Sequence, residues 1–393
     1  MKKYFLQFYR EEDFLYGPDR IVNFNNGLSL VWDQLKKQGE MVWRNVDDET
    51  IVAIEGIIYA SVWYTKSLRL LYNWAKTYPN LVVYACGPLV LHYGITLGKE
   101  LPNFHVSNLN AEDLLCNGQI SEWNLEVVET DKPIGYSVAL VNGYGCYWGK
   151  CRYCKILGEL KYREIYKVPV IESPHKKFIW LHVYSMPPFF MKKLYPQFEN
   201  RDDVIYATYI RGDKYSTKAL KEILPLLKVD PKNLAFNLGI EYPSDKMLKY
   251  MNKGATVKDY LNFIEICSKN DIRLHFNFIL GWKPTDYDDL DSMKDFLDKL
   301  NNVSKPDTIT ANVYPLTIMP DRKIAKEYSM QDMELCETDY DVYVGLSKQN
   351  EKQKIINNKI RNLIITYPFL KVYDVSEKDE KWRKNHLGES EKK

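Results

Sequence analysis

The chain has 393 residues, 45% hydrophobic and 27% charged, so it is long enough for two or three globular domains and is not expected to be disordered. Its 54 Lys and Arg residues balance 52 Asp and Glu residues, which disfavours a nucleic-acid substrate. The sequence shows no run of about 18 apolar residues and no signal-peptide core, so we expect a cytoplasmic protein without a membrane partner.

Residues 1–125 are predicted to form an open, Rossmann-like α/β domain, joined by a linker at residues 126–134 to the next domain. Strands are predicted over Tyr4–Tyr9, Thr50–Tyr59 and Leu81–Ala85, and helices over Gly27–Gln38 and Thr65–Thr77. Strands that alternate with helices pair in parallel, and ligands then bind beyond their carboxyl ends. The turns that begin at Ser61 and Cys86 would lie at those ends.

Residues 135–320 are predicted to continue the alternation as a partial barrel of six strand–helix units, short of the full eight. Its strands are predicted over Ser137–Asn142, Phe178–Tyr184, Val204–Ile210, Leu234–Ile240, Arg273–Leu280 and Thr308–Tyr314. Its helices are predicted over Pro188–Tyr195, Thr217–Leu227, Val257–Lys269 and Asp286–Leu300. Residues 321–393 are predicted to be a mixed extension, with a helix over Lys348–Asn362 and a charged tail.

Three of the seven cysteines, Cys146, Cys151 and Cys154, lie within nine residues, directly after the first predicted barrel strand. In a reducing compartment such a group favours metal binding or catalysis over disulfides. Three thiolates on one loop can hold three irons of a [4Fe-4S] cluster and leave the fourth iron open for a ligand. A structural zinc site is the alternative, but it uses four ligands, and no other Cys or His lies within 20 residues of this loop.

Cys151-Arg152-Tyr153-Cys154 resembles the Cys-x-aromatic-Cys end of the cluster motif of the radical S-adenosylmethionine (SAM) superfamily. Four residues separate Cys146 from Cys151, where that superfamily usually has three. Three later stretches resemble its strand-end motifs, in the same order. They are Gly239-Ile240-Glu241 with a trailing Asn252-Lys253-Gly254, Phe278-Ile279-Leu280-Gly281, and Tyr314-Pro315-Leu316-Thr317. The resemblance covers roughly residues 135–320.

The resemblance implies a [4Fe-4S] cluster, SAM, and an external electron donor of the flavodoxin or ferredoxin type. The expected product is a 5′-deoxyadenosyl radical that abstracts hydrogen from an unactivated carbon. Arg211, after the third strand, would pair with the SAM carboxylate. The alternative interpretation of Arg211 is a solvated surface arginine without a role in the site. Glu241 would accept a bond from the ribose or the amino group, and Ser185 would replace the acid usual after the second strand. The remaining cofactor contacts would come from Tyr153, Asn277, Ile279 and Gly281 near the adenine, and from Tyr314.

An α/β domain placed before such a barrel resembles the cobalamin-binding-domain subfamily. Cys86-Gly87-Pro88 stands where that subfamily often has Gly-Gly-Pro, so Ser61, Gly87 and Pro88 would face a corrin or its nucleotide tail. The cobalt-ligand motif Asp-x-His-x-x-Gly is absent. Some members of the subfamily bind cobalamin without this motif and others bind none, so cobalamin stays an open alternative.

Two kinds of reaction fit these motifs. The first is cobalamin-dependent C-methylation, and the second is a cobalamin-independent epimerisation, crosslinking or rearrangement. An epimerase needs a thiol as hydrogen donor, and Cys336 is the candidate because Cys267 has the helical setting of a buried structural cysteine. We expect a ribosomally made peptide or a small natural-product intermediate as substrate. The contrasting class is a non-catalytic module that binds a cluster or zinc.

Overall fold

The structure is a computed structural model, and it confirms the α/β class. It describes residues 2–8, 22–23, 41–46, 53–61, 65–86, 101–106, 136–139, 143–144, 146–154, 161–162, 177–180, 185–198, 200–202, 204–305, 308–318, 323–328, 333–338, 342–347, 349–368 and 370–374. The chain divides into two compact units. The first comprises Met1–Leu140, Lys167–Ile179 and Glu337–Val342, and the second comprises Val141–Tyr166, Trp180–Cys336 and Tyr343–Lys393.

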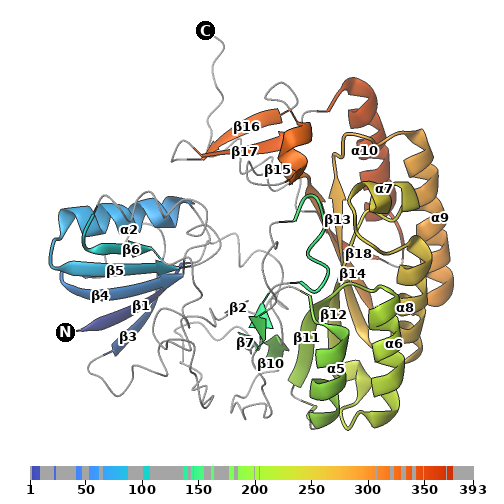
Figure 1. Cartoon of the computed structure of the whole chain (residues 1–393), viewed down its shortest axis with the longest axis horizontal. Helices are drawn as coiled ribbons and strands as arrows, with labels where there is room; N and C mark the ends of the chain where they lie inside the picture. The colour runs from blue at the N-terminus through green and yellow to red at the C-terminus, as the bar shows by residue number, and fades with distance from the viewer. Residues whose placement is uncertain are drawn as a thin grey trace. The chain divides into compact units, whose positions relative to one another are not determined.

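The first unit contains a five-stranded parallel sheet with the order β3-β1-β4-β5-β6 (Figure 1). Its strands are β1 (Lys3–Phe8), β3 (Met41–Val46), β4 (Gly56–Ser61), β5 (Leu81–Cys86) and β6 (Phe104–Val106). The helix α2 (Thr65–Thr77) covers one face of the sheet, where Leu68, Leu71 and Trp74 join the buried strand residues. A short strand, β2 (Val22–Asn23), pairs in parallel with β7 (Tyr136–Ala139).

Local patterns located three of the described elements of this unit correctly. The predicted strands at Tyr4–Tyr9 and Leu81–Ala85 and the helix at Thr65–Thr77 are confirmed. The strand predicted over Thr50–Tyr59 begins later, at Gly56. The strands β3 and β6 were not predicted, and the predicted helix at Gly27–Gln38 lies outside the described residues.

The second unit is built on parallel strands that follow one another in the sheet in chain order. They are β11 (Val204–Ile210), β12 (Leu234–Glu241), β13 (Arg273–Leu280) and β14 (Ile309–Pro315), and all four were predicted. The strand β18 (Lys371–Asp374), which was not predicted, pairs in parallel with β14. Of the first two predicted barrel strands the structure describes Tyr136–Ala139 (β7) and Lys177–Trp180 (β10), and the rest of each prediction lies outside the described residues. Closure into a partial barrel stays a prediction.

Helices connect the parallel strands and lie on one side of them (Figure 1). They are α5 (Pro188–Leu194), α6 (Lys214–Ile223), α7 (Asp245–Tyr250), α8 (Val257–Lys269) and α9 (Tyr287–Val303), with α10 (Glu351–Ile365) before β18. Short 3₁₀ turns occupy Tyr195–Gln197, Leu224–Leu226, Pro231–Asn233 and Lys323–Glu327. The smaller strands are β8 (Gly143–Tyr144) with β9 (Lys161–Tyr162), and a sheet of β15 (Thr317–Ile318), β17 (Val342–Ser347) and β16 (Met333–Thr338).

The helix starts follow from their capping residues. Thr256 caps α8 in a reciprocal box with Asp259, and Asp286 caps α9 in the same way with Asp289. Such boxes satisfy backbone N–H groups that have no partner within the helix, so they mark where a helix begins. Among the described residues, no helix is long and apolar enough to span a membrane.

The two faces of the central strands differ in character. Along β12, β13 and β14 every second residue is buried, because successive side chains of a strand point to opposite faces and helices cover one of those faces. The covered face carries Phe236, whose ring lies 5.9 Å from that of Phe263 in α8. The other face is half-buried and polar. It carries Asn237, His275, Asn277, Thr310, Asn312 and Tyr314.

Candidate functional site

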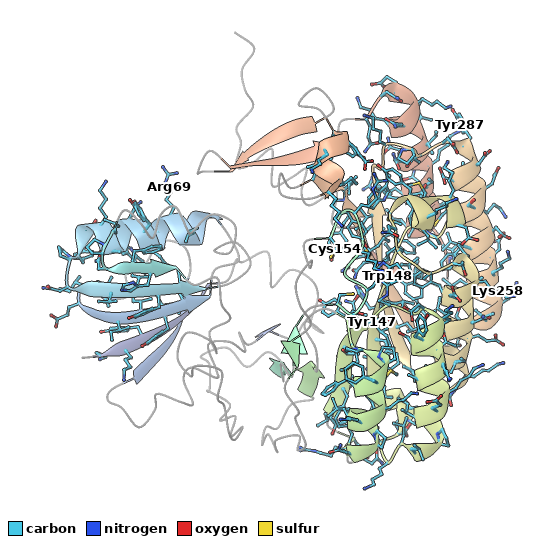
Figure 2. The ribbon with its side chains drawn as sticks, in the orientation of Figure 1. Arg69, Tyr147, Trp148, Cys154, Lys258 and Tyr287 are labelled. Atoms are coloured by element: carbon cyan, nitrogen blue, oxygen red, sulfur yellow. The ribbon has the colours of Figure 1, made fainter. Side chains whose placement is uncertain are left out.

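The cysteine loop, residues 146–154, lies against the segments that follow β11 and β12. Cys146 forms a parallel β-bridge with Ser185. The Arg152 backbone N–H donates to Met251 at 3.0 Å, and the Trp148 indole donates to the Asn252 carbonyl at 2.7 Å. Figure 2 shows Tyr147, Trp148 and Cys154 along one edge of the second unit. The loop therefore lies where sites of parallel strands are expected.

Gly254 is a position in this contact where only glycine fits. Its φ is +65°, a conformation that residues with a Cβ rarely adopt, and a Cβ there would run into the Trp148 ring. The ring instead rests on bare backbone. This explains physically why the Asn-Lys-Gly stretch of the sequence ends in glycine.

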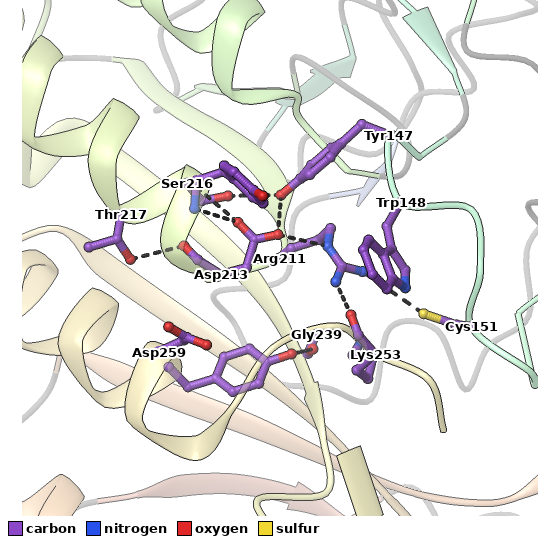
Figure 3. Close-up of polar contacts among 12 residues, drawn as sticks. Tyr147, Trp148, Cys151, Arg211, Asp213, Ser216, Thr217, Gly239, Lys253 and Asp259 are labelled. Atoms are coloured by element: carbon purple, nitrogen blue, oxygen red, sulfur yellow. Dashed lines mark hydrogen bonds and ion pairs between the residues drawn. The ribbon is translucent and has the colours of Figure 1, made fainter. Parts of the chain in front are cut away.

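A buried ion pair supports the first half of the loop (Figure 3). Arg211 Nε lies 3.1 Å from Asp213 Oδ2, and the two side chains are 4% and 2% exposed. The Tyr147 hydroxyl donates to the same carboxylate oxygen at 2.7 Å, while Asp213 Oδ1 accepts the backbone N–H groups of Tyr215 and Ser216 at the start of α6. Asp213 thus joins the loop, the arginine and a helix N-terminus.

The other guanidinium nitrogens of Arg211 reach the loop and the glycine segment. Nη1 lies 3.9 Å from Cys151 Sγ, and Nη2 donates to the Lys253 carbonyl. The guanidinium carbon also lies 5.0 Å and 5.6 Å from the ring centroids of Trp148 and Tyr147. Burial by itself lowers the pKa of Arg211, but its neighbours, Tyr260 first, raise it above the usual value, so the guanidinium stays protonated. The alternative of a solvated surface arginine is therefore wrong.

A second buried network joins the aromatic residue of the cysteine motif to the end of β12. The Tyr153 hydroxyl lies 3.0 Å from Glu241 Oε1, and Lys253 Nζ lies 3.0 Å from that hydroxyl and 3.2 Å from the carboxylate. The side chains of Lys253 and Glu241 are 6% and 13% exposed. Burial opposes the charged form of Lys253, yet Tyr153 and Glu241 raise its pKa well above the usual value. Burial, and then Glu241, raise the pKa of Tyr153.

The backbone at Glu241 is unusual. Its φ is +62°, and the pairing of β12 with β13 shifts register between Leu238 and Glu241. Gly239 leaves the room that this arrangement needs, since a Cβ there would lie 2.9 Å from Glu241 Oε1. A strained, bulged strand end that aims a carboxylate is typical of functional sites.

The predicted adenine contacts lie on the polar face of the sheet. Asn277 donates to the Asn237 side chain at 2.7 Å, and Ile279 pairs in register with Tyr314. Gly281 directly follows the last residue of β13, and its φ is +101°. The contact of these residues with a cofactor stays a prediction.

The remaining predicted residues belong to the first unit, to β16 or α8, or to segments outside the described residues. Ser61 and Cys86 are register partners at the ends of β4 and β5, in the first unit. Cys336 lies in β16. The side chains of Cys336 and Ser61 are not among those described, and Gly87 and Pro88 lie outside the described residues. Cys267 is fully buried in α8, as predicted for a structural cysteine, and burial raises the pKa of its thiol well above the usual value.

Sequence reasoning missed three residues of the site: Asp213, Tyr147 and Lys253. Each had a usable signal. Asp213 stands two residues after Arg211 and directly before a helix, as an N-cap does. Tyr147 lies in the cysteine loop and Lys253 in the Asn-Lys-Gly stretch, both of which stand out in the sequence. Their hydrogen-bond partners, Asp213 and Tyr153, lie 66 and 100 positions away in the sequence.

The loop offers chemistry that suits an iron–sulfur cluster. Among the described residues, no three Cys, His, Asp or Glu side chains converge as ligands of a single metal ion. A cubic cluster makes a different demand, because each thiolate binds its own iron. Ser185, which bridges Cys146, is 6% exposed, and its hydroxyl has no hydrogen-bond partner in the described part of the chain. Such a buried, unsatisfied hydroxyl is what a ligand beside the cysteines would satisfy. The residues present therefore fit a cluster with an additional ligand.

No protein-family model and no curated protein sequence matches this chain. Solved structures do match. The cobalamin-dependent S-adenosylmethionine radical enzyme OxsB, with aqua-cobalamin and S-adenosylmethionine bound, aligns with a TM-score of 0.58 at 13% identity, over 91% of this chain and 66% of OxsB. The chain thus spans about two thirds of the length of OxsB.

The radical S-adenosylmethionine methyltransferase TsrM from Kitasatospora setae, with cobalamin and a [4Fe-4S] cluster bound, aligns with a TM-score of 0.57 at 8% identity, over 95% of this chain and 91% of TsrM. The structure of TsrM with tryptophan substrate and a SAM analog aligns with a TM-score of 0.58 at 8% identity, over 94% of this chain and 90% of TsrM. The protein therefore has the fold of cobalamin-dependent radical SAM enzymes.

Proposed function

We propose that the protein is a radical SAM enzyme that holds a [4Fe-4S] cluster and SAM in its second unit and cobalamin in its first. One observation carries this proposal. A loop with three cysteines lies at the ends of parallel strands, beside a buried hydroxyl that has no hydrogen-bond partner among the described residues, in a chain with the fold of cobalamin-dependent radical SAM enzymes.

The thiolates of Cys146, Cys151 and Cys154 would hold the cluster. When bound, the reduced cluster supplies the electron that cleaves SAM into methionine and a 5′-deoxyadenosyl radical. The Ser185 hydroxyl would bond the ligand of the open iron. The Lys253 ammonium lies within hydrogen-bond distance of the Glu241 carboxylate and the Tyr153 hydroxyl, and so would hold both in position for SAM. Asn277, Ile279 and Tyr314 would complete the cofactor's surroundings on the polar face.

We propose C-methylation of an unactivated carbon as the reaction, because TsrM, which shares the fold over most of its length, is a methyltransferase. Ser61, Gly87 and Pro88 would face the cobalamin at the carboxyl ends of β4 and β5. The substrate would be a peptide or a small natural-product intermediate, and the electron donor a flavodoxin or ferredoxin. The near-neutral charge, 54 basic against 52 acidic residues, supports a substrate other than nucleic acid.

Anaerobic reconstitution tests the cluster. We expect about four irons and four sulfides per chain with a reduced-state EPR signal. Cys151→Ala should lose the cluster, and the matched control Cys267→Ala should keep it, because Cys267 is buried in α8. Zinc without iron in the wild-type protein would refute the proposal.

Two further measurements test the reaction. Reduced, reconstituted protein mixed with SAM should release 5′-deoxyadenosine, whereas a non-catalytic module would release none. After incubation with hydroxocobalamin and gel filtration, the protein should keep the corrin's visible spectrum. Protein that releases 5′-deoxyadenosine but retains no corrin would eliminate methylation by cobalamin and leave the radical chemistry standing.

A further inference from the structure

We propose that Arg211 is a positioning residue for the cysteine loop: its guanidinium fixes residues 147–151 onto the segment after β11 and donates a hydrogen bond to Cys151 Sγ. This assignment differs from the pairing with the SAM carboxylate that the sequence suggests. The tuning of a cluster by Arg211 rests on the proposed function, whereas the anchoring of the loop does not.

The contacts of Arg211 concentrate on the loop. Its guanidinium meets three of the loop's residues, namely Tyr147, Trp148 and Cys151. The same group meets Asp213 and the Lys253 carbonyl. One planar fork thus ties together the cysteine loop, the end of β11 and the glycine segment after α7, which only arginine among the cationic side chains can do.

Burial argues against a direct role in holding a cofactor carboxylate. Each of the three guanidinium nitrogens already donates to a protein acceptor, and the side chain is only 4% exposed. Nη1 and Nη2 each carry one more N–H, but at 4% exposure a carboxylate could reach them only by opening the loop, and it could replace Asp213 only by leaving that acid buried at 2% exposure without its cation. Removing one member of a buried pair is strongly destabilising, so Asp213 keeps the arginine.

The position of Nη1 gives the anchor a second effect. A hydrogen bond and a fixed positive charge near a thiolate sulfur stabilise electron density there. Arg211 should therefore make a cluster held by Cys151 easier to reduce. Among the described hydrogen bonds of this guanidinium, one reaches a cysteine of the loop, Cys151.

Thiol labelling of the apoprotein tests the anchor without any cluster. Iodoacetamide reactivity would be followed cysteine by cysteine by mass spectrometry in wild type, Arg211→Lys, and the control Arg273→Lys, which changes an exposed arginine at the start of β13. We expect Arg211→Lys to speed labelling of Cys151 about tenfold by local opening, and Arg273→Lys to leave it unchanged. Cys267, buried in α8, reports global unfolding and should stay protected.

Tyr147→Phe provides a milder test that leaves no buried charge unpaired. It removes only the hydroxyl that donates to Asp213 at 2.7 Å, and should speed Cys151 labelling by a smaller factor. Unchanged Cys151 labelling in both variants, with Cys267 still protected, would overturn the anchor.

The reconstituted enzyme tests the second effect. In Arg211→Lys the cluster potential should shift to a more negative value, while the Kd for SAM changes less than about twofold. An unchanged potential would overturn the tuning. A Kd weakened tenfold or more, with Cys151 labelling and potential unchanged, would instead restore the carboxylate-binding role. If the wild type takes up no cluster, the proposed function fails and the labelling result still decides the anchor.

Discussion

Lys253 offers the sharpest test of how the second network is held together. Lys253→Met keeps much of the side-chain volume but removes the ammonium that lies 3.2 Å from Glu241 Oε1. At an effective dielectric of about 20, two unit charges at that distance attract by roughly 5 kcal/mol. Desolvation offsets part of that attraction, yet losing one partner of a buried pair still costs about 3–5 kcal/mol. We expect the free energy of unfolding to fall by that amount.

A double-mutant cycle separates the pair from its surroundings. Glu241→Gln should also destabilise the protein, because it leaves the ammonium buried. The double variant, Lys253→Met with Glu241→Gln, should lose clearly less than the sum of the two single losses. Urea unfolding of the apoprotein, followed by tryptophan fluorescence, measures all four proteins, since Trp282 lies edge-on to Tyr153 at 5.3 Å. Additive losses would refute the idea that the pair is coupled.

Three further predictions concern neighbouring features. Gly254→Ala should destabilise the apoprotein by at least roughly 1–2 kcal/mol in urea, because alanine must adopt φ +65° and meet Trp148. Ser185→Ala should stabilise the apoprotein by about 1 kcal/mol, since it removes a buried hydroxyl that has no partner in the described part of the chain, yet weaken SAM binding measured by calorimetry. Equal SAM affinity in that variant would contradict the assignment of Ser185. Stability should fall as the pH rises above 10: tyrosines ionise near 10 when unfolded, whereas burial raises the pKa of Tyr147 and Tyr195 in the folded chain. Because the pKa of these tyrosines is higher in the folded chain, their contribution to stability is complete below pH 10 and is lost as the pH rises above it. Free energies of unfolding measured at pH 8, 10 and 11 would show this loss.

Local sequence signals located the elements that depend on near neighbours. The predicted bounds of α8, Val257–Lys269, match the structure, because the Thr256 capping box and the apolar spacing lie within the helix itself. The strands β12 and β13 were recognisable from alternation that one covered face imposes. The strand β18 escaped prediction because it has only four residues, and its pairing with β14 joins residues some 60 positions apart. So short a segment carries too little pattern to be recognised alone.

For the candidate site, the sequence by itself determined which loop carries the chemistry, because three cysteines within nine residues are a local pattern. It could not decide what the other site residues do. Arg211 was expected at the mouth of the strands, where it does lie, but only the tertiary structure showed that its guanidinium meets Cys151 and the Lys253 carbonyl. Hydrogen bonds and ion pairs form between atoms a few ångströms apart, and sequence separation says nothing about that distance until the chain has folded.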